Sequence, residues 1–168
     1  MSFDQMGLDS ALTQAVAHAG YASATEVQLA AIPPALAGQD LMVSSCTGSG
    51  KTASFILPAL QRVLKARAEF HAQRTGNAAG AESVRRDTPR RAARILVLVP
   101  TRELALQVSK AADTYGRMVK NLRLATIVGG VPYPAQLAAL RGGPDIIIAT
   151  PGRLLDHLQS GRCDLGSV

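Results

Sequence analysis

The sequence lacks the residues that typify secreted, metal-binding and membrane-spanning proteins. It has no tryptophan, two cysteines and three histidines among 168 residues. Cys46 and Cys163 show no metal-ligand spacing, and two cysteines give no disulfide framework. No apolar run approaches the roughly 20 residues that a membrane helix needs. The first residues include Asp4 and Asp9 and lack the basic and apolar regions of a signal peptide. These absences predict a cytoplasmic protein without membrane contacts.

Positive charge is concentrated in one stretch of the chain. The net charge is +6, and residues 65–94 contain eight basic residues against three acidic ones, so the remainder carries only +1. Hydrophobic residues make up 47% of the sequence, which is enough for the core of one domain. Residues 70–93 are rich in alanine, glycine and arginine without a sustained period, and we expect a long, basic, mobile insertion there.

A glycine-rich stretch predicts a phosphate-binding loop. Residues 45–52 read Ser-Cys-Thr-Gly-Ser-Gly-Lys-Thr, after the apolar run 41–43 and before a segment that can start a helix. Small residues allow backbone N–H groups to surround a phosphate, and the N-terminus of the following helix attracts the same anion. Lys51 would contact the terminal phosphates, and the Thr52 hydroxyl would hold Mg²⁺. The alternative is a glycine turn that carries Lys-Thr by chance.

Apolar runs that alternate with helical patterns predict an α/β fold, a parallel sheet with flanking helices. The expected strands are 41–43, 94–99, 124–128 and 146–149, and the second of these is expected to be fully buried. Helices are expected from Thr52 to about Ala68, from Thr101, over 134–140 and over 153–159. A kink or restart is expected at Pro58. Ligands of such sheets bind beyond the carboxyl ends of the strands.

The N-terminal part predicts two helices. Asp9 or Ser10 can cap the first, and Gly20 can end it. Thr25 and Gln28 have the spacing of a capping box for the second, and Pro33 and Pro34 are expected to bend or end that helix.

Several motifs occur in an order that resembles one protein family. Gly-Tyr at 20–21 and Thr-Glu-Val-Gln at 25–28 precede the phosphate loop, and Pro-Thr-Arg-Glu-Leu at 100–104, Gly-Gly at 129–130 and Thr-Pro-Gly-Arg at 150–153 follow it. The chain thus resembles the first, RecA-like P-loop domain of bacterial-type DEAD-box ATP-dependent RNA helicases. The resemblance covers nearly the whole chain, and the combination of the last three motifs is its most specific part.

The resemblance implies an adenine site in the first 40 residues. Gln28 would hydrogen-bond the adenine edge, Tyr21 would stack on the ring, and Phe3 would pack behind it. The nucleotide would be ATP with Mg²⁺, held by Ser45, Cys46, Thr47, Gly48, Ser49, Gly50, Lys51 and Thr52. The alternatives are a capping box alone for Gln28 and ordinary core packing for Phe3 and Tyr21.

The resemblance also implies contacts to the RNA backbone without sequence preference. The residues concerned are Pro100, Thr101, Arg102, Gly129, Gly130, Thr150, Pro151, Gly152 and Arg153. A helix N-terminus and an arginine can hold a phosphate together at each strand-to-helix junction. Read alone, Thr101 and Thr150 would be plain helix caps beside solvated arginines. The arginines of the basic insertion could also bind RNA, although a solvated loop is the simpler interpretation.

The implied domain is expected to be incomplete at its C-terminus, because the Asp-Glu-Ala-Asp segment of the family does not occur before Val168. Its expected regions are 1–40 for adenine, 41–69 for the phosphate loop and helix, 70–93 for the insertion and 94–168 for RNA contacts. We expect a complete helicase that couples ATP hydrolysis to duplex unwinding, with Lys51 and Thr52 as its catalytic residues here, and a 168-residue chain that is inactive alone. The alternative is a nucleotide- or RNA-binding module without turnover.

Overall fold

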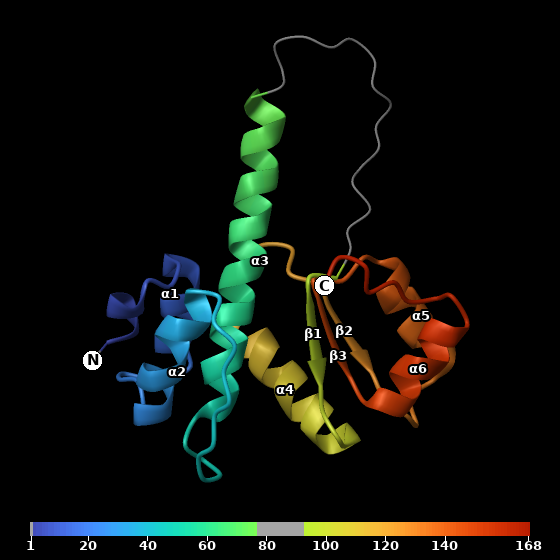
Figure 1. Cartoon of the computed structure of the whole chain (residues 1–168), viewed down its shortest axis with the longest axis horizontal. Coiled ribbons are helices and arrows are strands. Elements are labelled where there is room, and N and C mark those ends of the chain that lie inside the picture. The colour runs from blue at the N-terminus through green and yellow to red at the C-terminus, as the bar shows by residue number, and fades with distance from the viewer. Residues whose placement is uncertain (1, 77–92) are drawn as a thin grey trace. The chain divides into compact units, whose positions relative to one another are not determined.

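The computed structural model describes residues 2–76 and 93–168, and these residues form two compact units. Unit 1 comprises Met1–Arg62 and Leu106–Leu122, and unit 2 comprises Val63–Ala105 and Arg123–Val168. Figure 1 shows the elements of both, and each unit is described by itself. In the described parts of the chain no helix is long and apolar enough to cross a membrane.

Unit 1 begins with a short 3₁₀ helix, η1 (Phe3–Met6), and helix α1 (Ser10–His18). The Asp9 carboxylate accepts the N–H of Ala11 at 2.8 Å, so the predicted cap of this helix is confirmed. The backbone N–H of Asp9 donates to Oε1 of Gln61 at 2.7 Å, which ties the start of α1 to a residue 52 positions away. Buried apolar side chains of both elements belong to the core of unit 1, namely Phe3, Met6, Leu12, Ala15 and Val16.

Helix α2 (Glu26–Leu36) begins with the predicted capping box, because Oε1 of Gln28 accepts the N–H of Thr25 at 3.0 Å. Pro33 and Pro34 were predicted to bend or end this helix, and they do not end it, since α2 continues to Leu36. Both prolines lie in its second half, where their missing N–H groups cost only hydrogen bonds near the helix end. The N–H of Ala37 still donates to the carbonyl oxygen of Pro33 at 3.0 Å.

The strand predicted at Leu41–Val43 is absent. These residues have no regular structure, and Leu41, Met42 and Val43 are all exposed, Met42 completely. A parallel strand needs the backbone of a neighbouring strand as its partner. No described segment pairs with residues 41–43, and an apolar sequence alone does not make a strand.

Helix α3 (Lys51–Gly76) is longer than predicted. It begins directly after the glycine-rich loop and passes Pro58 without a restart. It also continues beyond Ala68, so residues 70–76 are helical, whereas the sequence predicts no regular structure there. Residues 77–92 of the predicted insertion, with Arg85, Arg86, Arg90 and Arg91, lie outside the described residues, whereas Ala93, its last residue, is buried in the core of unit 2.

The described part of unit 2 contains a parallel sheet of three strands: β1 (Ile95–Leu98), β2 (Leu124–Ile127) and β3 (Ile146–Ala149). Their order is β1-β3-β2, so β3 is central, and it is buried throughout. Ile146 lies opposite both Ile95 and Leu124, and Ala149 lies opposite both Leu98 and Ile127. The parallel sheet is confirmed, with three of the four predicted strands.

The prediction that β1 is fully buried is wrong. Its residues are half-buried, and Leu98 is 53% exposed. An unbroken apolar run indicates a strand covered on both faces, but β1 pairs with β3 alone and lies at an edge of the described sheet.

Two helices cover one side of the sheet in Figure 1, α5 (Tyr133–Arg141) and α6 (Pro151–Gln159). Leu154 of α6 is buried in one cluster with Ala125, Ile127, Ile147 and Ala149 of β2 and β3. Ala139 and Leu140 of α5 pack against the same cluster. Both helices were predicted from their sequence patterns, and both are confirmed within two residues at each end.

Asp145, which directly precedes β3, joins three segments of unit 2. Its carboxylate accepts hydrogen bonds from Nη2 of Arg67 at 2.7 Å and from the backbone N–H of Arg123 at 2.9 Å. Its carbonyl oxygen accepts the N–H of Arg94 at 2.9 Å. Asp145 therefore fixes the starts of the strands, and so sets the register with which they reach their carboxyl ends.

Candidate functional site

The glycine-rich loop of unit 1 ends at the first turn of α3. Gly48 and Gly50 have φ values of 82° and 91°, a region that side chains disfavour. The loop is closed internally, because the Ser49 hydroxyl donates to the carbonyl oxygen of Cys46 at 2.8 Å. Since α3 begins at Lys51, its free N–H groups and positive dipole end lie beside this loop. This combination is suited to a bound phosphate.

The Lys51 ammonium is folded over the loop. Nζ donates to the carbonyl oxygens of Ser45 and Cys46, at the start of the glycine-rich stretch. A cation held there satisfies oxygen acceptors of the backbone, and phosphate oxygens would offer it stronger, charged acceptors. Loop, helix start and cation together would fit the phosphates of a nucleotide, and the binding of a nucleotide here stays a prediction.

Gln28 is buried and contacts the loop. Its Nε2 donates to the carbonyl oxygen of Gly50 at 3.2 Å, while its Oε1 accepts the Thr25 N–H. The side chain is 2% exposed. An amide retains one further N–H and one further lone pair after these two bonds. The capping box is therefore confirmed and a contact to the phosphate loop is added, while the role of Gln28 in adenine binding stays a prediction.

The two predicted adenine-site aromatics differ in exposure. Phe3 is 4% exposed and belongs to the core, as its alternative interpretation holds. Tyr21 is 48% exposed, with its ring centroid 6.2 Å from that of Tyr115 at an angle of 54°. Burial raises the pKa of Tyr115, and its hydrogen bond with Tyr21 raises it further. Tyr21 thus has an exposed surface on which adenine would stack, whereas the buried Phe3 would only support such a site from the core.

Thr52 lies half-buried in the first turn of α3 and is the predicted Mg²⁺ ligand. Among residues 2–76 and 93–168, no group of three histidine, cysteine, aspartate or glutamate residues could hold a metal ion. A hydroxyl beside nucleotide phosphates is a suitable ligand for Mg²⁺, which keeps several waters and few protein ligands.

In unit 2 the three predicted RNA-contacting segments meet at one edge. Because β1, β3 and β2 are parallel neighbours, the segments at 100–102, 150–153 and 129–130 all leave the sheet at its carboxyl ends. The N–H of Val99 donates to the carbonyl oxygen of Ala149 at 3.0 Å, and that of Thr150 donates to Ile127 at 3.0 Å. Hydrogen bonds therefore continue past the strands and fix the start of each segment.

Arg102 lies directly over the glycine turn. A Cβ added at Gly130 would be 2.5 Å from Nη1 of Arg102, and Gly130 has a φ of 73°. Arg102 opens helix α4 (Arg102–Tyr115), whose first turn is capped by Thr101, since the hydroxyl of Thr101 accepts the N–H of Leu104 at 3.2 Å. Pro100, Thr101 and Arg102 are exposed, as are Gly129 and Gly130. The structure therefore brings two of the predicted segments into direct contact.

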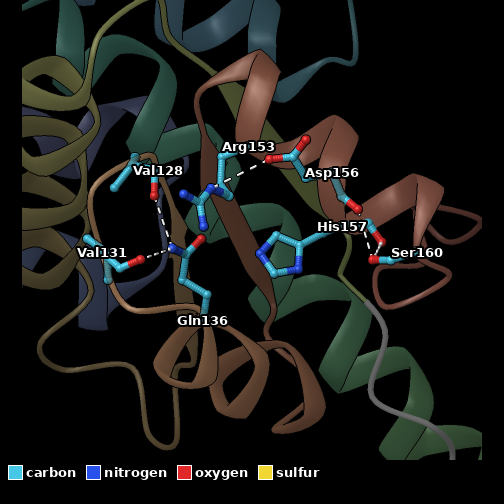
Figure 2. Close-up of polar contacts among 7 residues, drawn as sticks. All are labelled: Val128, Val131, Gln136, Arg153, Asp156, His157 and Ser160. Carbon is cyan, nitrogen blue, oxygen red and sulfur yellow. Dashed lines mark hydrogen bonds and ion pairs between the residues drawn. The ribbon is translucent and has the colours of Figure 1, made fainter.

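Sequence reasoning missed Gln136, whose buried side chain is hydrogen-bonded to the backbone on both sides of the Gly129-Gly130 turn. Gln136 lies in α5 and is 1% exposed, and its Nε2 donates to the carbonyl oxygens of Val128 and Val131 at 3.0 Å each (Figure 2). These carbonyls flank the two glycines. The available signal was one amide in a short, otherwise apolar helical segment, which is uncommon unless the amide has backbone partners.

The third segment begins helix α6. Thr150 occupies the N-cap position, although its side chain makes no capping hydrogen bond, and Pro151 and Gly152 are exposed in the first turn. Arg153 is half-buried, with Nε 3.8 Å from Oδ2 of Asp156 and its guanidinium carbon 5.4 Å from the centre of the Tyr133 ring. The ring of Tyr133 thus helps to position Arg153, and sequence reasoning did not select Tyr133 as a site residue.

Comparisons with known proteins agree with these motifs. The family described as DEAD/DEAH box helicase matches residues 25–168. A Dictyostelium discoideum protein named "Probable ATP-dependent RNA helicase ddx27" is 41% identical over 94% of this chain and 17% of its own length. ATP-dependent RNA helicase DeaD of Escherichia coli K12 is 37% identical over 99% of this chain and 23% of its own length. The chain thus spans about a fifth of these relatives.

Solved structures agree as well. A DEAD box protein from Methanococcus jannaschii is 31% identical with a TM-score of 0.78, over 100% of this chain and 39% of that one. A hypothetical ATP-dependent RNA helicase from Sulfolobus tokodaii is 34% identical with a TM-score of 0.74, over 95% of this chain and 39% of that one. The RecA-like α/β fold predicted from the sequence is confirmed. With its motifs, fold and family match in agreement, this chain belongs to the DEAD/DEAH box helicases.

Proposed function

We propose that this chain is part of an ATP-dependent RNA helicase, in which unit 1 binds the nucleotide and unit 2 binds the RNA backbone. The complete enzyme would couple ATP hydrolysis to the unwinding of RNA duplexes. Relatives named as ATP-dependent RNA helicases support this activity more than the alternative of a binding module without turnover.

The observation that carries the proposal is the contact between Arg102 and Gly130. A side chain at residue 130 would collide with Nη1 of Arg102, so the exposed turn presents its backbone and the guanidinium at one place. Backbone N–H groups and arginines that converge at a surface are typical of phosphate contacts. Because these groups face phosphates and sugars, they hold RNA without reading its sequence.

The nucleotide part of the proposal rests on the loop of unit 1. Lys51 and the free N–H groups of α3 would bind the phosphates, and the Thr52 hydroxyl would be a ligand of Mg²⁺. ATP with Mg²⁺ supplies the phosphoryl group that is transferred to water. In this chain Lys51 neutralises charge on the phosphates, the glycines let the backbone approach, and Tyr21 and Gln28 would select adenine.

The exposure of the two thiols fits a reducing compartment. Cys46 is exposed, Cys163 is half-buried, and both are free. We place the protein in the cytoplasm as part of this proposal.

Calorimetry and fluorescence anisotropy test the two units separately. Lys51→Ala should weaken the binding of ADP and ATP, whereas Lys65→Ala, an exposed lysine of the same helix, should not. GDP should bind more weakly than ADP if Tyr21 and Gln28 select the base. Equal binding of GDP and ADP would refute the adenine site.

The RNA test uses a single-stranded oligonucleotide at low salt. Arg102→Ala combined with Arg153→Ala should abolish most of the binding, while Arg141→Ala, an exposed arginine at the end of α5, should leave it almost unchanged. Affinity that is independent of Arg102 and Arg153 would refute the RNA-binding edge of unit 2.

A further inference from the structure

Tyr133, at the start of α5, gathers three side chains around its ring. The imidazole of His157 is stacked on it, with the centroids 4.4 Å apart and an interplanar angle of 16°. The guanidinium carbons of Arg153 and Arg162 each lie 5.4 Å from the centre of the same ring. We refer to Tyr133, Arg153, His157 and Arg162 as the tyrosine cluster. It joins the start of α5 to both ends of α6.

Arg162 is not selected by any motif of the sequence, yet its backbone position is fixed. Its N–H donates to the carbonyl oxygen of His157 at 2.9 Å, and Gly161 before it has a φ of 65°. The chain therefore turns back at the end of α6, as helix C-termini commonly do. The guanidinium reaches the Tyr133 ring from this anchored position, and it is attracted by the π-electrons of the ring.

The cluster has more positive than negative charge. The guanidinium carbons of Arg153 and Arg162 each lie 5.4 Å from the centre of the Tyr133 ring. The two carbons can therefore be no farther apart than twice that distance. Of the nearby acids, Asp156 lies 3.8 Å from Arg153, and Asp164 accepts the N–H of Gly166 at 2.8 Å. Burial lowers the pKa of His157, and Arg153 and Arg162 lower it further, so the imidazole adds no charge at neutral pH.

Two positive charges that are held close together, with too few acidic groups to neutralise them, favour the binding of an anion. An arginine after a helix C-terminus is also attracted to the free carbonyls of that helix. That attraction alone would not account for the position of Arg162 over a ring that Arg153 shares. The planar guanidinium suits both tasks, because it can stack on an aromatic face while its N–H groups remain free for phosphate oxygens.

We propose that Arg162, held on the Tyr133 ring beside Arg153, binds a second backbone phosphate of the RNA strand that Arg153 contacts. The RNA-binding edge of unit 2 then extends from the start of α6 to its end. Tyr133 is the positioning residue of both arginines. The proposal rests on the proposed function, because it needs RNA at Arg153.

The test measures the affinity of the full chain for a fluorescent oligouridine as a function of salt. Each lost phosphate contact on a single strand lowers the slope of log affinity against log salt by about 0.7. Arg162→Ala should lower the slope by this amount and weaken binding about two- to fivefold at low salt, as one exposed charge contact does. Arg153→Ala should act similarly. Tyr133→Leu should lower the slope at least as much as Arg162→Ala, while Tyr133→Phe, which keeps the ring, should not.

Arg141→Ala serves as the matched control, since Arg141 is an exposed arginine of α5 outside the cluster, and its slope should equal that of the unchanged chain. Arg162 is exposed, so its replacement leaves the core intact, and circular dichroism checks each variant. A slope unchanged by Arg162→Ala, but lowered by Arg153→Ala, would overturn the second phosphate contact and leave the proposed function standing. Slopes unchanged by both would overturn this proposal and the RNA contact at Arg153, while Arg102→Ala combined with Arg153→Ala remains the separate test of the proposed function.

Discussion

Gln28 and Gly50 are in contact across 22 residues of sequence, because Nε2 of Gln28 donates to the carbonyl oxygen of Gly50 at 3.2 Å. A Cβ added at Gly50 would lie 2.4 Å from that nitrogen. The start of α2 and the phosphate loop therefore support each other, so that a disturbance of the helix start is transmitted to the loop that would hold the nucleotide.

We expect Gly50→Ala to destabilise unit 1 more than Gly48→Ala does. Both residues have a positive φ, which costs alanine about 1–2 kcal/mol, but a Cβ at Gly48 meets nothing within 4 Å. Gly50→Ala must in addition displace Gln28 and lose its hydrogen bond, a further ~1 kcal/mol. Urea unfolding without nucleotide measures both variants. Equal losses would show that the contact to Gln28 contributes nothing.

Gly130→Ala should weaken RNA binding through Arg102. The added Cβ would lie 2.5 Å from Nη1 of Arg102, whereas a Cβ at Gly129 meets nothing within 4 Å, so Gly129→Ala is the comparison that adds a methyl group to the same turn without displacing Arg102. The guanidinium can move, so the effect on stability is limited to the strain of the positive φ, about 1–2 kcal/mol. In an Arg102→Ala background, Gly130→Ala should have no further effect on affinity. Additive losses in the double variant would contradict a route through Arg102.

Asp145→Ala should lower the free energy of unfolding of unit 2 by about 2–3 kcal/mol. The carboxylate accepts one charged and one backbone hydrogen bond, and the Arg67 and Asp145 side chains are only 27% and 14% exposed. Asp145→Asn should lose less, since the amide oxygen can still accept the Arg123 N–H.

Asp156→Ala provides the comparison for this ion pair. Its carboxylate is 61% exposed and lies 3.8 Å from Arg153, so its removal should cost less than about 1 kcal/mol. Thermal or urea unfolding of the three variants gives the order, and a loss at Asp156 as large as at Asp145 would contradict it.

The stability of unit 2 should fall as the pH drops below the ordinary pKa of histidine, about 6.5. Burial lowers the pKa of His157, as do Arg153 and Arg162, while Asp156 opposes the shift. The unfolded chain therefore binds the proton at a higher pH than the folded chain does. The stabilisation is complete above the unfolded pKa and is lost as the pH falls towards the folded one.

His157→Phe should reduce this pH dependence. Phenylalanine keeps a ring against Tyr133, and both ring nitrogens of His157 are buried without hydrogen-bond partners among the described residues. The variant lacks these two unpaired nitrogens, so at pH 7 it should be as stable as the unchanged chain or up to ~1–3 kcal/mol more stable. Unfolding curves between pH 5 and 7 test this, and an identical slope in both proteins would assign the titration to another group.

The 168-residue chain should bind nucleotide without hydrolysing it. Its described residues supply Lys51, Thr52 and the amides of the loop, whereas phosphoryl transfer also needs a positioned water and further positive charge, worth ~10³–10⁵ in rate for an arginine finger alone. ADP should bind at least as well as ATP. A phosphate-release assay with and without RNA measures turnover, and RNA-stimulated release that Lys51→Ala abolishes would refute this expectation.

Local rules predicted much of the fold. The cap at Asp9, the capping box at Thr25 and the cap at Thr101 follow from residues three or fewer positions apart, and all three form. The central strand at Ile146–Ala149 was predicted at its observed bounds, because four buried residues in a row leave no ambiguity of period. The order of the motifs placed three segments at the carboxyl edge of the sheet.

The wrong and missing predictions concern residues whose structure or role depends on a segment that is distant in sequence. Residues 41–43 are as apolar as a strand, but no described backbone pairs with them, and β1 is half-buried because it lies at a sheet edge. Gln136 acts through two carbonyl oxygens that only the folded turn brings to it. The role of Tyr133 depends on Arg153, His157 and Arg162, which follow it by 20 or more residues.

The tyrosine pair of unit 1 has a consequence for spectroscopy. Without tryptophan, the near-ultraviolet emission of the chain comes from its three tyrosines. Tyr21, half exposed beside Tyr115, lies where adenine is predicted to stack, while Tyr133 of unit 2 is surrounded by two guanidinium groups and an imidazole. Quenching by a nucleotide and quenching by RNA would thus come from different fluorophores. Replacing Tyr133 or Tyr21 with phenylalanine would give an unlabelled chain whose emission reports one ligand at a time.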